Sequence, residues 1–257
     1  TSYAMPLCRC FCHSASACRN ALRTRFFRPQ VCFCLIIQLF NLSYCNRPEP
    51  CLKAKILSGG NLCHAATEGA HAAIIPAKNK YLFGPVPSRR LGRSLGIDLT
   101  PFKTCSFDCI FCQLGRTTCL MADRAEYVPV AAVVDELDVW LKNGGQADII
   151  TFAGSGEPTL HSGIGEIIAH LKKQTQIPVA VLTNGSLLHL PEIRKSIALA
   201  DIVKVSLSAW NDASLQTINR PASGLNFSSL VAGERQFRQE FSGQLWMEVF
   251  ALDGINS

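Results

Sequence analysis

The chain has 257 residues, of which 48% are hydrophobic, so it can bury the core of one large α/β domain or of two small ones. Its formal charge of +6 is uneven, because residues 1–80 contain ten Lys or Arg and two Asp or Glu, whereas residues 81–257 contain 15 and 17. The second segment therefore has no excess of positive charge, which excludes a case for nucleic-acid binding based on global electrostatics.

Residues 1–80 show neither a helical nor a strand period, and they hold nine of the 13 cysteines. The apolar run at residues 31–40 is shorter than the roughly 20 residues that span a bilayer. It also lies too far along the chain for an ordinary secretion signal. Two interpretations remain open: an Arg-rich leader such as an organellar transit peptide, or a stretch that is not native coding sequence. We expect an irregular extension, disordered or non-native, with no membrane association.

From residue 81 onward, short apolar strands alternate with amphipathic helices. The predicted strands cover residues 94–99, 148–153, 179–183, 202–207 and 245–250. The predicted helices cover residues 130–141 and 164–171, a short segment that begins at Pro191, and residues 227–241. This alternation predicts parallel βα units in an α/β domain at residues 81–257, with helices covering the sheet.

Three cysteines lie within eight residues, in the spacing Cys105-x3-Cys109-x2-Cys112. They can present three thiolates to one inorganic centre, and three thiolates on a four-iron cluster leave one iron open to an outside ligand. Zinc is the alternative, although its sites usually combine paired C-x2-C units or Cys and His, and the nearest further ligand is Cys119. A disulfide is less favoured, because cysteines this close form strained loops.

Polar or glycine-rich segments follow the next three predicted strands, at the strand ends where parallel βα folds place reactive residues. They are residues 154–158 (Gly-Ser-Gly-Glu-Pro), 183–186 (Thr-Asn-Gly-Ser) and 206–208 (Ser-Leu-Ser), and Arg220 lies after the last of them. Each has an ordinary structural interpretation as well. Asn-Gly favours a turn, small serines pack a barrel interior, and an arginine forms surface salt bridges as readily as it binds a carboxylate.

Several other residues are expected to have structural rather than functional roles. Arg89 and Arg90 belong to a basic turn that we expect to be exposed, with phosphate binding as the alternative. His161 and His189 follow the second and third strands and are expected to be solvated. Two of the three tryptophans, Trp210 and Trp246, are expected in the core.

The cysteine spacing, with Phe111 just before its last member, resembles the signature of the radical S-adenosylmethionine (radical SAM) superfamily. The segment 154–158 resembles the Gly-Gly-Glu-Pro loop of the same superfamily. Together with residues 84–101, these motifs resemble a branch near the tRNA wyosine-synthesising enzymes. The resemblance covers residues 81–257. It implies a partial (βα) barrel of the radical SAM type with about five of its six strands present, so that the chain is truncated at its C-terminus.

The resemblance also implies a set of site residues. Cys105, Cys109 and Cys112 would bind a [4Fe–4S] cluster, whose open iron chelates S-adenosylmethionine (SAM). No catalytic side chain is assigned. The expected SAM-binding residues are Gly154, Gly156, Glu157, Asn184, Ser186, Ser206, Ser208 and Arg220.

The implied function is reductive cleavage of SAM to a 5′-deoxyadenosyl radical, which abstracts hydrogen from an unidentified substrate. An external electron donor of the flavodoxin or ferredoxin type is expected, with a small molecule or a tRNA as substrate and a cytoplasmic location. The rival hypothesis is a non-catalytic zinc- or iron–sulfur-binding module, associated with RNA.

Overall fold

The computed structural model describes residues 80–256. The expectations for the N-terminal extension, including its apolar run at residues 31–40, concern residues outside this range and stay predictions. The same is true of the domain division at residue 80.

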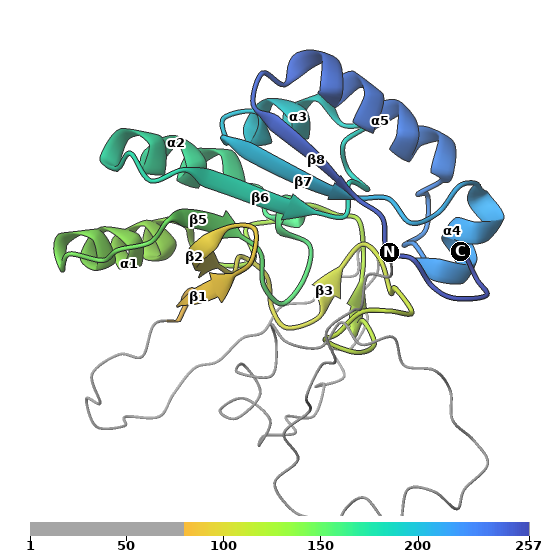
Figure 1. Ribbon diagram of the computed structural model, residues 1–257, viewed down its shortest axis with the longest axis horizontal. Helices are drawn as coiled ribbons and strands as arrows, with labels where there is room; N and C mark the ends of the chain where they lie inside the picture. Colours follow the sequence, from red (N-terminus) through yellow and green to blue (C-terminus); the bar gives the residue numbers. More distant parts are fainter. Residues whose placement is uncertain (1–79, 257) are drawn as a thin grey trace, which may run out of the picture. The chain divides into compact units, whose positions relative to one another are not determined.

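A six-stranded sheet forms the centre of the described part of the chain, in the order β1-β2-β5-β6-β7-β8 (Figure 1). Its strands are β1 (Leu82–Ser88), β2 (Gly92–Ile97), β5 (Ile149–Phe152), β6 (Val179–Thr183), β7 (Ile202–Ser206) and β8 (Gln244–Glu248). The pairings from β2 to β8 are all parallel, whereas β1 pairs with β2 antiparallel. The predicted α/β fold with a parallel sheet is confirmed.

Four helices lie against one face of this sheet (Figure 1). They are α1 (Val130–Lys142), α2 (Ile164–Gln174), α3 (Pro191–Ile197) and α5 (Phe227–Glu240). Side chains alternate between the two faces of a strand. Val203 and Val205 of β7 therefore share the apolar core with Ile167 and Phe237 of the helices, while Lys204 between them is only partly buried. We call this buried side of the sheet the helix-covered face.

Several elements escaped prediction from the sequence. Strand β1 contains Pro85 and Pro87, which are typical of loops but tolerated on an edge strand. Strands β3 (Thr104–Cys105) and β4 (Cys119–Leu120), together with the 3-10 helix η1 (Pro158–Leu160), are too short to show a period. Helix α4 (Asp212–Ile218) begins at an Asn211/Ser214 capping box, a readable signal. Among residues 80–256, no helix combines the length and hydropathy that crossing a membrane requires.

Candidate active site

The three cysteines lie in the segment between β2 and β4, residues 98–118, which contains the short strand β3 and which we call the cysteine loop. We call this segment and the loops after β5, β6 and β7 the carboxyl rim. Cys105 ends β3, and the Cys112 amide donates to the carbonyl of Cys109 at 3.1 Å. All three thiols are half-buried. Within residues 80–256, no three His, Cys, Asp or Glu side chains are grouped closely enough to share a single metal ion.

The surroundings of Cys105 and Cys109 disfavour a free thiolate. Burial raises the pKa of Cys105 to about 12, and Glu157 and Cys109 add to this shift. Burial likewise raises the pKa of Cys109 to about 11, with a contribution from Cys112. Neighbouring thiolates in a poorly hydrated site are therefore costly by themselves, and coordinated metal charge is what stabilises thiolates in such surroundings. The donor set fits an iron–sulfur centre.

The loop after β5 packs directly against the cysteine loop. A side chain at Gly156 would overlap the carbonyl of Thr104, and one at Gly154, which has a left-handed φ of 153°, would meet the carboxylate of Asp98. Asp98 in turn accepts a hydrogen bond from the Ser155 amide at 2.9 Å. Both glycines are therefore required by close approach. Gly154 is exposed and Gly156 half-buried, so their backbones remain accessible to a ligand.

Glu157 is enclosed by hydrogen-bond donors of the chain itself, and its predicted contact with the ammonium group of SAM stays a prediction. Its side chain is 2% exposed, and Oε1 accepts hydrogen bonds from the amide and hydroxyl of Thr159 and from the hydroxyl of Thr183. Oε2 accepts from the Asn184 amide at 2.8 Å. Burial raises the pKa of this carboxyl, and the hydrogen bonds oppose that shift. Through these contacts Glu157 connects the loops after β5 and β6.

Asn184 and Ser186 contact the cysteine loop. The Asn184 amide nitrogen donates to Ser106 Oγ at 2.8 Å and reaches Cys105 Sγ at 3.7 Å. Ser186 is 1% exposed, and its hydroxyl is 2.7 Å from that of Ser106. The structure thus brings both residues to the predicted site. Ser186, however, is buried against protein, whereas Asn184 is half-buried.

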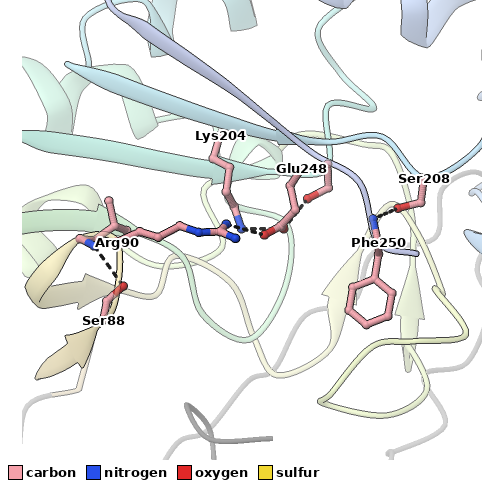
Figure 2. Close-up of polar contacts among 8 residues, drawn as sticks. Ser88, Arg90, Lys204, Ser208, Glu248 and Phe250 are labelled. Atoms are coloured by element: carbon pink, nitrogen blue, oxygen red, sulfur yellow. Dashed lines mark hydrogen bonds and ion pairs between the residues drawn. The ribbon is translucent and has the colours of Figure 1, made fainter. Parts of the chain in front are cut away.

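Ser206 and Ser208 have different surroundings. The Ser206 hydroxyl donates to Glu248 Oε2, which also receives the Lys204 ammonium at 2.6 Å. Ser208 is 5% exposed and accepts from the Phe250 amide at 3.0 Å, and Figure 2 shows this contact beside the Lys204–Glu248 pair. Ser208 therefore fixes the segment after β8 through its acceptor oxygen, and its contact with SAM stays a prediction.

Arg220 lies at the edge of the cysteine loop with a left-handed φ of 48°. Its guanidinium is 3.7 Å from Asp108 Oδ2, and Arg116 contacts the same oxygen at 2.8 Å. The contact with Asp108 is a salt bridge, the structural role that the sequence allows beside carboxylate binding. The Arg220 side chain is 43% exposed, so its guanidinium keeps access to solvent.

Two structural expectations were wrong. His161 is fully buried, with Nε2 2.8 Å from the carbonyl of Val128, and burial lowers its pKa. Trp210 is 55% exposed instead of lying in the core. Arg90 is exposed as expected, at 3.7 Å from Glu248.

Reasoning from the sequence missed three residues that contact the site: Lys103, Ser106 and Asn219. Lys103 and Ser106 flank Cys105, so proximity in sequence was an available signal. Asn219 is 110 positions from the cysteine that it contacts, and nothing in its local sequence indicates that contact.

Comparisons with known proteins place the chain in a family. The sequence pattern of the Radical SAM superfamily matches residues 99–228, about half of the chain. A protein named GTPase Obg from Brachyspira hyodysenteriae is 46% identical over 179 residues, which are 70% of this chain and 26% of that protein. A UPF0026 protein from Synechocystis is 42% identical over 173 residues, 66% of this chain and 64% of the relative.

The chain thus spans between about a quarter and two thirds of the length of these relatives. Among solved structures, one of TYW1 with a lysine-pyruvate adduct has a TM-score of 0.45 and 16% identity, covering 64% of this chain and 57% of that one. The match to the superfamily pattern contains the cysteine loop and the loops after β5, β6 and β7, and by it the chain belongs to the Radical SAM superfamily.

Proposed function

We propose that this chain forms the catalytic core of a radical SAM enzyme, with Cys105, Cys109 and Cys112 as the protein ligands of a [4Fe–4S] cluster. The observation that carries the proposal is the set of three half-buried thiols in one short segment at the carboxyl rim. Three thiolates leave one iron of such a cluster for SAM. When bound and reduced, the cluster supplies the electron that cleaves SAM into methionine and a 5′-deoxyadenosyl radical, which abstracts hydrogen from the substrate.

The rim residues have two roles in this proposal, divided by their accessibility. Groups that keep some access to solvent bind SAM: the backbones of Gly154 and Gly156, and the side chains of Asn184, Ser206 and Arg220, which also contact other residues of the chain. Buried groups with protein partners position the loops: Glu157, Ser186 and Ser208. Holding the loops in place before the ligand arrives reduces the entropy that binding would otherwise cost.

The reaction requires a one-electron donor, for which we propose a flavodoxin- or ferredoxin-type protein of the cytoplasm. The substrate is a small molecule or a tRNA. Residues 81–257 contain 15 basic and 17 acidic residues, so their overall charge does not attract tRNA. Substrate recognition therefore depends on local contacts.

The first test is anaerobic reconstitution with iron and sulfide. Wild-type protein should turn brown and bind about four irons per chain. Cys109→Ala should lose the intact cluster, because Cys109 is the middle ligand. Cys119→Ala is the matched control, since it removes a thiol from β4, outside the spacing, and should retain the iron. Unchanged iron in Cys109→Ala would contradict the ligand assignment. Colourless protein with about one tightly bound zinc would favour the non-catalytic module.

The second test measures SAM binding and cleavage. Reconstituted protein with dithionite should convert SAM to 5′-deoxyadenosine, and the conversion should stop without reductant. Binding is measured separately, as a change in the cluster's electron paramagnetic resonance spectrum on addition of SAM. A cluster whose spectrum does not respond to SAM would contradict the proposed enzyme.

A further inference from the structure

Each of the three cysteine thiols receives a hydrogen bond from a different side-chain nitrogen. Lys103 Nζ lies 3.1 Å from Cys112 Sγ, and Asn219 Nδ2 lies 3.2 Å from Cys109 Sγ. The third donor is Asn184 Nδ2, at 3.7 Å from Cys105 Sγ. The donors come from the segment before β3, the end of α4 and the loop after β6, so three separate parts of the chain converge on the thiols.

Lys103 is held in place by its backbone. Its side chain is 3% exposed and its φ is 59°, a left-handed conformation that is uncommon for residues other than glycine. The Lys103 amide donates to the Ser155 carbonyl at 2.8 Å, and its own carbonyl accepts from the Cys119 amide at 3.1 Å. Surrounding hydrogen bonds of this kind are what keep a residue in a strained conformation, and such residues concentrate at functional sites.

The two asparagines are also fixed. Asn219 is 5% exposed and caps the C-terminus of α4, and its carbonyl accepts from the Asp108 amide at 2.8 Å. Asn184 Oδ1 accepts from the Ser186 amide at 3.0 Å, which leaves the amide nitrogen directed at the cysteine loop. In both residues the side-chain nitrogen contacts a cysteine sulfur while other hydrogen bonds hold the residue in position.

Hydrogen bonds to the sulfurs of an iron–sulfur cluster withdraw electron density from the thiolates and are among the factors that set its reduction potential. A buried ammonium adds a positive charge, which favours the state with one more electron. We propose that Lys103, Asn219 and Asn184 are positioning residues that raise the reduction potential of the cluster held by Cys105, Cys109 and Cys112, with Lys103 contributing most. This inference rests on the proposed function.

The test is a potentiometric titration of reconstituted protein with dithionite, followed by electron paramagnetic resonance, with iron content measured in parallel. Lys103→Met removes the charge and keeps the approximate length of the side chain. We expect full iron content and a midpoint potential that is more negative than in wild type. Lys103→Arg should return most of the shift. Asn219→Ala should move the potential in the same direction by less, because the asparagine is uncharged.

Lys172→Met is the matched control. Lys172 lies on α2 and pairs with Asp201 at 2.7 Å, so its loss removes a paired lysine elsewhere on the protein and should leave the potential unchanged. If wild type holds a cluster and the midpoint potential of Lys103→Met equals that of Lys172→Met, this inference is overturned, whereas the proposed function is not. If Lys103→Met does not retain iron, an unchanged potential in Asn219→Ala overturns it. Wild-type protein without a cluster would overturn the proposed function and, with it, this inference.

Discussion

The helix-covered face and the carboxyl rim both contain buried side chains, but these side chains differ in kind. On the helix-covered face the buried side chains are apolar, such as Val203, Ile167 and Phe237. At the rim they are polar, such as Glu157 and Ser186, and each has hydrogen-bond partners within the chain. Apolar burial is non-directional, whereas a buried polar group requires a particular partner. The first region therefore supplies stability, and the second defines positions.

Truncating a side chain on the helix-covered face should have the largest effect on stability. Phe237 is fully buried and stacks on Phe241 at 4.8 Å between ring centroids. Phe237→Ala should lower the free energy of unfolding by about 3–5 kcal/mol, because it removes apolar contact and leaves a cavity. Urea denaturation measures this loss. Phe102→Ala, at a side chain that is 63% exposed, is the control and should change stability by less than about 0.5 kcal/mol. Similar losses in both variants would contradict the comparison.

At the rim, Glu157→Ala should lower the free energy of unfolding by about 1–3 kcal/mol, because amide and hydroxyl donors lose their acceptor. The loss is partly offset, because the desolvation cost of the buried carboxylate is removed as well. Iron retention should fall as well, since Glu157 connects the loops after β5 and β6. Glu157→Gln keeps one carbonyl acceptor and should lose less of both. Measurements of unfolding and of iron content distinguish Glu157→Ala from Phe237→Ala. The Phe237 variant should lose stability but, at temperatures where it is folded, should retain iron.

Glu234 on α5 is an exception on the helix-covered face. Among the described residues, its Oε1 is the one buried side-chain oxygen or nitrogen without a hydrogen-bond partner. Burial raises its pKa from 4.5 to about 7. Between about pH 4.5 and pH 7 the Glu234 carboxyl is protonated in the folded protein and ionised in the unfolded chain. Raising the pH through this range therefore lowers the free energy of unfolding. Glu234→Gln should remove this dependence and add on the order of 1 kcal/mol at pH 8.

Urea denaturation at pH 5 and pH 8 tests this expectation, with Glu166→Gln, at an exposed position of α2, as the control. The Glu234 variant should gain stability relative to wild type at pH 8 more than at pH 5. An equal difference at both pH values would show that the buried carboxyl does not contribute to the pH dependence.

Ser186→Ala should have the smallest effect, about 0.5–1.5 kcal/mol, since it removes one neutral hydrogen bond with Ser106. Ser223→Ala is the control at an exposed position. A thermal unfolding series compares them. If Ser186→Ala lowers the free energy of unfolding as much as Phe237→Ala does, the rim contributes to stability as much as the helix-covered face, and the comparison is wrong.

The division between what was and was not predictable follows the same two regions. Strand β6 was predicted at its observed bounds, residues 179–183, and the helix that begins at Ile164 was placed correctly apart from its last turn. Their apolar period is a local property, so it is visible in a single sequence. Strand β1 was missed because its prolines are typical of loops, and Trp210 was placed wrongly because residue type alone does not specify burial.

The sequence by itself determined the parallel α/β fold, the trio Cys105, Cys109 and Cys112 and the loops that gather around it, because each depends on spacing or on a local period. Only the tertiary structure decided that Glu157 is enclosed by donors and that Asn219 reaches a cysteine 110 positions away. A hydrogen-bond partner is selected by three-dimensional proximity and direction, and neither property is encoded in the residues beside it.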